Sequence, residues 1–206
     1  YKAKVPFKRL FLYIYRSNFT MSKIKFGTDG WRGIIAKDFT VANVARVAKA
    51  TADWVLRQNP NAAIVVGYNC RFGGTLFSTT AINVFVQQGI KVYFDPNFVS
   101  TPMISLGAKT LGCELGVIFT ASHNPPSYNG YKLKAKHGGP LIVKYIEEIE
   151  NEIPDAFVIE ETGVEELVKQ GKVEVVDLED MYFNHVAAHF DLEAINNSGF
   201  VVAYDA

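Results

Sequence analysis

The sequence predicts an α/β protein in which a mixed or mainly parallel sheet is sandwiched between helices. Short apolar runs typical of buried strands alternate along most of the 206 residues with segments of helical periodicity. Right-handed crossovers between such strands would place helices on both faces of the sheet. The composition, with 49% apolar and 20% charged residues, is that of a globular protein with a core. The sequence contains no run of about 18 apolar residues, so a transmembrane helix is not expected.

Helices are predicted where apolar side chains recur at intervals of three and four residues. Residues 41–58 have such a face, with Thr40 as a suitable N-cap and Asn59-Pro60 as a stop signal. The same periodicity predicts helices over residues 75–88, 102–110, 142–152, 162–170 and 178–189. Gly89 fits the end of the second of these helices.

Strands are predicted where apolar, often β-branched residues form short continuous runs. The clearest run is AIVVGY at residues 63–68, and further strands are predicted at residues 91–94, 114–119 and 131–134. After the break at residues 196–199, Phe200–Tyr204 reads as a new strand. No partner strand follows it, so we expect the chain to be truncated at the opening of a second α/β domain. Residues 191–206 would then be the linker and first strand of that domain.

The charge is unevenly distributed along the chain. Residues 1–25 hold seven basic residues and no acid, and the remaining residues, with 14 basic and 21 acidic groups, have a net charge of −7. This balance argues against nucleic-acid binding over most of the chain. We interpret residues 1–20 as an extension outside the fold. A transit-like peptide and a nucleic-acid or membrane arm are the alternatives. The two cysteines fit reduced thiols and a cytoplasmic location.

The strongest candidate for chemistry is the segment FTASHNPPSYNGYK, residues 119–132. Ser122 directly follows a predicted strand, and ligands of open α/β sheets bind at the carboxyl ends of strands. Asn129-Gly130 is a turn signal that would bring Lys132 back toward the serine. Adjacent side chains on extended backbone point to opposite sides, so a hydrolase dyad of Ser122 and His123 is not expected. Phosphoryl transfer fits better, with Lys132, Arg32 and His123 as cationic groups around the serine.

Two glycine-rich segments accompany the serine segment. FGTDGWRG covers residues 26–33, and GYNCRFGG covers residues 67–74 at the end of a predicted strand. Glycine permits close backbone approach and left-handed conformations. Taken alone, each segment is a weak indication of function.

The motifs GTDGWRG, GYNCRFGG and TASHNPPSYNGYKLK together resemble, in order and spacing, those of the α-D-phosphohexomutase superfamily of phosphoglucomutases and phosphomannomutases. The resemblance spans about Met21 to Ala206, and it implies that residues 21–190 are domain I with its phosphoserine loop. It further implies an intramolecular phosphotransferase that interconverts hexose 1-phosphate and hexose 6-phosphate through a hexose 1,6-bisphosphate. Trp31 and the NGYK version of the loop favour glucose or mannose phosphates.

The resemblance also assigns roles to residues. Ser122 would be the phosphoserine, and Lys132, Arg32 and His123 would be the other catalytic residues. Positioning or phosphate binding would fall to Asn124, Arg71, Thr28, Asp29 and Gly30. Mg²⁺ would bind a phosphoryl oxygen on Ser122 and three aspartates of a D-G-D-x-D-R loop that these 206 residues lack. Asn69 and Cys70 stand where the family commonly has Asp and Thr, so a direct role of position 69 is not implied.

Two other classes of function compete with the mutase. A stand-alone sugar-phosphate-binding module would use the same loops without turnover, and a serine hydrolase would use Ser122 as nucleophile. As partners we expect small-molecule hexose phosphates and the remaining domains of the same chain, and neither nucleic acid nor membrane. The 206 residues by themselves are expected to be inactive as a mutase.

Overall fold

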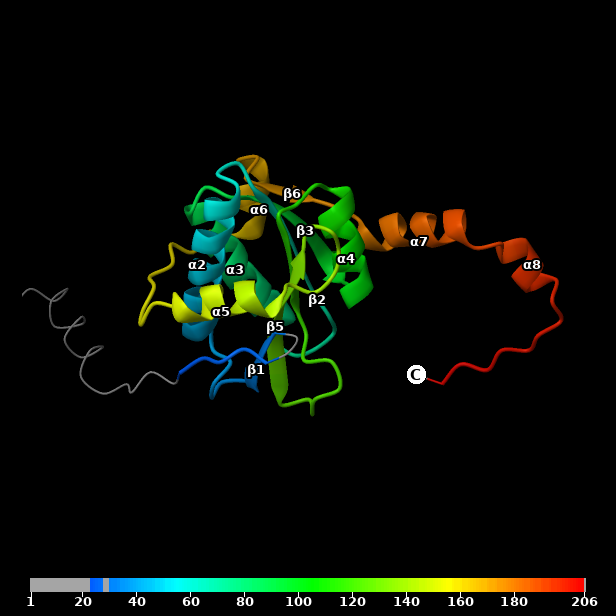
Figure 1. Cartoon of the computed structure of the whole chain (residues 1–206), viewed down its shortest axis with the longest axis horizontal. Coiled ribbons are helices and arrows are strands. Elements are labelled where there is room, and N and C mark those ends of the chain that lie inside the picture. Colours follow the sequence, from blue (N-terminus) through cyan, green and yellow to red (C-terminus); the bar gives the residue numbers. More distant parts are fainter. Residues whose placement is uncertain (1–22, 28–29, 206) are drawn as a thin grey trace, which may run out of the picture.

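The computed structural model describes residues 23–27 and 30–205, which form a three-layer α/β/α domain with an extended C-terminal segment (Figure 1). The predicted extension, residues 1–20, lies outside the described residues. The strands are β1 (Trp31–Ile34), β2 (Ala63–Tyr68), β3 (Lys91–Phe98), β4 (Leu115–Phe119), β5 (Tyr128–Ala135) and β6 (Val173–Val175). The helices are α2 (Val41–Gln58), α3 (Gly74–Gln87), α4 (Thr101–Thr110), α5 (Val143–Asn151), α6 (Val164–Lys169), α7 (Leu178–His189) and α8 (Leu192–Asn196).

The strands form one six-stranded sheet in the order β1-β5-β4-β2-β3-β6. β4, β2, β3 and β6 are parallel to one another, whereas β5 runs antiparallel to both β1 and β4. The prediction of a mixed or mainly parallel sheet between helices is therefore confirmed. The central strands β2 and β4 are continuous in apolar residues because helices cover both of their faces.

Helices pack on both faces of the sheet (Figure 1). One face carries α2, α3, α5 and α6 over the larger core, in which Phe39, Phe119 and Tyr131 are fully buried. The other face carries α4 and the start of α7 over a smaller core around Ile104 and Leu178. Burial of these side chains supplies the main free energy of folding. In the part of the chain that the structure describes, no helix is long and apolar enough to cross a membrane.

The helix signals of the sequence are confirmed with small shifts at the ends. Thr40 caps α2, and its hydroxyl oxygen accepts a hydrogen bond from the Asn43 amide at 3.2 Å. Asn59 is the C-cap of the same helix. Gly89 has a φ of +83° just beyond α3, a conformation that glycine adopts at no steric cost.

Three short elements, β1, β6 and α8, are not predicted from the sequence. β1 is the four-residue run WRGI, and β6 is the three-residue run VEV. Neither is long enough to show a periodic pattern, and both exist through pairing with β5 and β3 respectively. Their formation is decided by neighbours far away in the chain.

The strand predicted over Phe200–Tyr204 is not formed in this structure. Residues 200–204 are exposed and leave the body of the domain beyond α7 and α8 (Figure 1). A strand requires a partner for its backbone groups, and no strand of the described chain lies beside this segment. Its assignment to a second domain stays a prediction.

Acidic residues of α5 tie this helix to the rest of the domain. Glu150 accepts a hydrogen bond from the Phe26 amide at 2.7 Å, and Glu148 accepts one from the Trp54 indole at 2.9 Å. These two acidic residues therefore hold α5 against the segment before β1 and against α2.

Asp95 on β3 joins the sheet to α7. Its carboxylate is 1% exposed and accepts hydrogen bonds from the amides of Leu178 at 2.8 Å and Asn97 at 2.9 Å. We predict that Asp95→Ala lowers the free energy of unfolding by about 1–3 kcal/mol, because buried amides lose their acceptor. Urea unfolding followed by circular dichroism measures this change. Glu179→Ala, at an exposed position, is the control and should stay within about 0.5 kcal/mol of wild type.

Candidate active site at the serine loop

The three sequence motifs meet at one edge of the sheet. β2 and β4 are paired neighbours, and Tyr68 lies opposite Phe119, so the loops that follow these two strands lie side by side. We call residues 120–127 the serine loop. β1 lies on the far side of β5, with Arg32 opposite Gly130, and the Thr120 amide donates to the Gly130 carbonyl at 3.0 Å. The sheet register therefore brings both glycine-rich segments to the serine loop. The sequence predicts a place at the carboxyl end of a strand for Ser122 and for GYNCRFGG.

Ser122 is exposed and has a φ of +54°. A non-glycine residue in this left-handed region is uncommon and is retained only where surrounding contacts hold it. The premise of extended backbone is therefore wrong at this position. As a result, the Ser122 hydroxyl lies 3.5 Å from Nδ1 of His123 instead of on the opposite side of the chain.

The Ser122–His123 pair does not form a hydrolase triad. A separation of 3.5 Å is at the outer limit of a hydrogen bond. Among the residues that the structure describes, no carboxylate contacts His123 to orient its ring. Base orientation by a third group is the mark of serine nucleophiles, so the geometry does not support hydrolysis.

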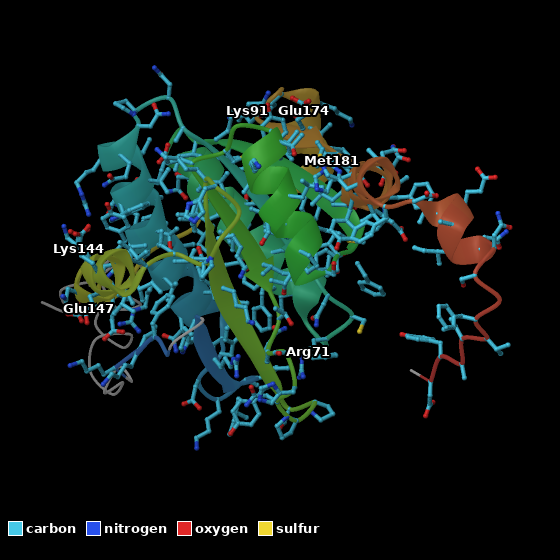
Figure 2. All side chains as sticks on the ribbon, turned by 45° about the vertical axis from the view of Figure 1, so that its right-hand side comes forward. Arg71, Lys91, Lys144, Glu147, Glu174 and Met181 are labelled. Carbon is cyan, nitrogen blue, oxygen red and sulfur yellow. The ribbon has the colours of Figure 1, made fainter. Side chains whose placement is uncertain are left out.

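Arg71 holds the serine loop through backbone carbonyls. Nη1 donates to the carbonyls of Pro125 at 2.9 Å and Tyr128 at 3.0 Å, and Nη2 donates to those of Ser122 at 2.7 Å and Asn124. In Figure 2 Arg71 lies in the lower half of the view, far from Lys91 and Glu174 at the top, where β3 begins. The planar guanidinium fits this role because its donors form a rigid fork.

Asn69 and Thr120 form a second link between the two loops. Nδ2 of Asn69 donates to Oγ1 of Thr120 at 2.9 Å, and the Ser122 amide donates to the same oxygen at 3.1 Å. The resemblance implied no direct role for position 69. In the structure Asn69 is linked to Ser122 through Thr120, whose hydroxyl oxygen accepts a hydrogen bond from each of them.

Arg32 reaches the serine loop from β1. Its Nη1 donates to Oδ1 of Asn124 at 2.8 Å, and the Asn124 amide donates to the Ala121 carbonyl at 3.1 Å. Arg32 is half-buried and is held on the short strand β1 by the ladder with β5. Arg32 therefore contacts the serine loop at Asn124.

Lys132 lies on β5, is 5% exposed, and pairs in register with Ile118 of β4. The prediction of a turn at Asn129-Gly130 is wrong, because both residues belong to β5 and the chain reverses earlier, where the Tyr128 amide donates to the Pro125 carbonyl at 3.0 Å. Gly130 has a different purpose. A Cβ at this position would lie 2.5 Å from the Thr120 carbonyl oxygen, so glycine permits the serine loop to approach β5.

The remaining predicted residues fall in the first glycine-rich segment. Thr28 and Asp29 lie outside the described residues. Gly30 has a φ of +107°, and a Cβ there would lie 2.4 Å from the Tyr131 carbonyl oxygen and 3.0 Å from Cγ of Lys132. Gly30 therefore lets the chain pass directly over Lys132. Trp31 is buried and stacks on Phe39 with ring centroids 4.5 Å apart, so it belongs to the core.

The described part of the site is rich in cationic side chains. Arg32, Arg71 and Lys132 all approach the serine loop or the chain beside it. Within residues 23–27 and 30–205, no group of three or more His, Cys, Asp or Glu side chains could hold a metal ion. Such a set of groups suits an anionic ligand, for which positive charge and backbone donors are the usual partners.

Comparisons with known proteins show which family this chain is similar to. The model of the family described as "Phosphoglucomutase/phosphomannomutase, alpha/beta/alpha domain I" matches residues 23–157. A phosphoglucosamine/phosphogalactosamine mutase of Sulfurisphaera tokodaii is 35% identical over 184 residues, which are 87% of this chain and 38% of that protein. A phosphoribomutase of Saccharomyces cerevisiae is 36% identical over 128 residues, 59% of this chain and 21% of that protein.

Solved structures show the same architecture. A protein of Thermus thermophilus assigned by name to the phosphomannomutases superposes with a TM-score of 0.78 at 34% identity, over 88% of this chain and 39% of that one. The open form of parafusin from Paramecium gives a TM-score of 0.76 at 19% identity and supports the fold alone. This chain therefore spans about two fifths of the length of these structures.

The contacts of Arg71 generate a first prediction for the site. Arg71→Lys replaces the fork with a single ammonium group that cannot reach carbonyls on both sides of the loop. We expect the free energy of unfolding to fall by about 1–3 kcal/mol. Chemical denaturation measures the change, and Arg57→Lys, in the exposed ion pair with Glu152, is the matched control with an expected effect below about 1 kcal/mol. Equal effects of the two substitutions would contradict the role of Arg71 in holding the serine loop.

The two cysteines generate a second prediction. Cys70 is exposed beside Arg71, whereas Cys113 is 1% exposed and burial raises its pKa to about 12. Because the thiolate is the reactive form, a disulfide reagent at about pH 8 should modify Cys70 rapidly in the folded protein and Cys113 only in denaturant. Cys70→Ser should abolish the rapid phase. Rapid reaction of both thiols in the native protein would show that the smaller core is open.

Proposed function

The chain belongs to the phosphoglucomutase/phosphomannomutase family as its domain I, and we propose that it carries the phosphoserine of a phosphohexomutase. The observation that carries this proposal is the conformation of Ser122. An exposed hydroxyl stands on a left-handed residue at the edge of the sheet, and cationic side chains from two other segments lie around its loop. A serine presented in this way can accept and return a phosphoryl group.

The reaction that we propose has two transfers. In the first, the phosphoryl group leaves Oγ of Ser122 and bonds to the free hydroxyl oxygen of a hexose monophosphate, which gives hexose 1,6-bisphosphate. In the second, after the intermediate reorients, the other phosphoryl group bonds to Oγ of Ser122 and the isomeric monophosphate is released. In each transfer one O–P bond forms and one breaks. The attacking hydroxyl gives its proton to a base, and the leaving oxygen takes up a proton and becomes a hydroxyl.

The described residues suggest how these steps are supported. Lys132 on β5 and Arg32 on β1 would stabilise charge on the transferring oxygens, and Lys132 is our candidate for the proton transfer. His123, whose ring lies beside the Ser122 hydroxyl, and Asn124, which is held by Arg32, would position the phosphoserine or the sugar. Arg71 donates to carbonyls of the loop, so we assign it to positioning and not to direct contact with the phosphate.

We also propose Mg²⁺ as the metal of the complete enzyme. When bound, the ion would neutralise charge on the phosphoryl group. From this chain it would take one phosphoryl oxygen on Ser122, a hard oxygen ligand that suits Mg²⁺. The aspartate loop that the resemblance implies does not occur in these 206 residues. The chain thus fits as a contributor of one ligand and not as a complete site.

The substrates that we propose are hexose phosphates, with glucose or mannose as the sugar. The names of the relatives cover phosphoglucosamine and phosphogalactosamine, ribose and glucose phosphates, so they do not select among sugars. Trp31 is buried in the core, so it does not select the sugar by direct contact. We further propose a cytoplasmic location, and residues 191–206 as the linker toward a second domain of the same polypeptide.

Ser122→Ala tests the proposed function. We expect intact-mass analysis of the freshly expressed encoded protein to show a fraction that carries one phosphoryl group, and this fraction should be absent in Ser122→Ala. Mutase activity on glucose 1-phosphate should fall by about 10³-fold or more, because no other group replaces the nucleophile. Ser127→Ala, an exposed serine in the same loop, is the matched control and should retain both properties.

Two outcomes would contradict the proposal. An unphosphorylated wild-type protein whose Ser122→Ala variant retains full activity would remove Ser122 from the chemistry. Binding of hexose phosphates without any turnover by the encoded protein would favour a sugar-phosphate-binding module.

A further inference from the structure

We infer that Asn69 is a positioning residue that directs the hydroxyl proton of Thr120 toward the phosphoryl group on Ser122. The inference rests on the proposed function, because it requires that Ser122 carries a phosphoryl group. It concerns a residue to which the sequence motifs assigned no role.

The Thr120 hydroxyl already accepts two hydrogen bonds. Its oxygen accepts from Nδ2 of Asn69 at 2.9 Å and from the Ser122 amide at 3.1 Å. A hydroxyl oxygen has two acceptor positions and one proton to donate. Both acceptor positions are occupied, so the proton is left as the remaining group that can form a hydrogen bond.

The orientation of the Asn69 side-chain amide is fixed by its contact with the Arg71 backbone. The Arg71 backbone amide lies 3.2 Å from Oδ1 of Asn69, and a backbone N–H can only donate. The oxygen must therefore face Arg71, which turns Nδ2 toward Thr120. The Asn69 backbone is itself held, since its amide donates to the Phe119 carbonyl at 3.1 Å.

The Thr120 hydroxyl proton needs an acceptor. Thr120 is 4% exposed, so solvent is not a ready acceptor. Within the part of the chain that the structure describes, the hydrogen bonds of the Thr120 hydroxyl are the two that it accepts, and it donates none. The amide nitrogen of Ser122 lies 3.1 Å from Oγ1 of Thr120, and Ser122 has a left-handed backbone conformation. A phosphoryl oxygen on Ser122 is the acceptor that fits.

A carboxylate at position 69 would reverse this arrangement. Asp has no proton to donate at neutral pH, so the Thr120 hydroxyl would donate to it while still accepting from the Ser122 amide. The serine loop would keep its shape, but the phosphoryl group would lose a donor. Asn69→Asp therefore separates orientation of the proton from stability of the loop.

The experiment is a ³¹P NMR titration of the phosphorylated encoded protein. It follows the second ionisation of the phosphoserine, whose pKa is ordinarily about 6. A donor to the dianion lowers this pKa. We expect Asn69→Asp to raise it by half a unit or more, which is about a threefold gain in proton affinity. Asn61→Asp, an exposed position before β2 at the other end of the same strand, is the matched control and should cause no shift.

A double-mutant cycle separates the proton from the added charge. In a Thr120→Val background, which lacks the hydroxyl, Asn69→Asp should shift the phosphoserine pKa much less than in wild type. An equal shift in both backgrounds, or no shift in Asn69→Asp, would overturn the inference.

A direct measurement keeps the test decisive if Thr120→Val does not fold. A ¹H–³¹P correlation spectrum should connect the Thr120 hydroxyl proton with the phosphorus in wild type, and this signal should be absent in Asn69→Asp. Absence of the signal from a phosphorylated wild-type protein would overturn the inference alone. A wild-type protein without phosphoserine would instead overturn the proposed function, and this inference with it.

Discussion

The contact of the Arg71 guanidinium with four backbone carbonyls between Ser122 and Tyr128 is the interaction on which the site depends. A loop that contains a non-glycine residue in the left-handed region does not retain that conformation unaided. Charge-assisted donors from one rigid group compensate for this cost at several points of the loop. The carbonyls thus turn toward Arg71, and the Ser122 hydroxyl is left exposed to a ligand.

The topology of the sheet explains why Arg71 is available for this contact. β2 and β4 are parallel neighbours, so the residues that follow each strand emerge at the same edge. β5 runs antiparallel to β4 and pairs with it through residues 131–135. β1 pairs with residues 128–131 of β5, next to the serine loop. Arg32 and Arg71 therefore reach the serine loop from two segments that are far from it in the sequence.

Much of the fold could be predicted from the sequence because its signals are local. Helix α2 shows its apolar face, its Thr40 cap and its stop at Asn59 within one window of residues. β1 could not be predicted in this way, since four residues pair only because β5 is beside them. Asn129-Gly130 was misleading for the same reason: its residues are typical of turns, but Gly130 is required by the close approach of Thr120.

The amino-acid sequence by itself determined the fold class, the order of the main elements, and the three motifs that identify the family. These features depend on periodicity and on residue identity within short windows. Only the tertiary structure decided that Ser122 is left-handed, that Arg71 serves the loop and that Asn69 reaches Thr120. Such contacts join residues about 50 positions apart, and their geometry follows from strand register, which no local pattern of side chains encodes.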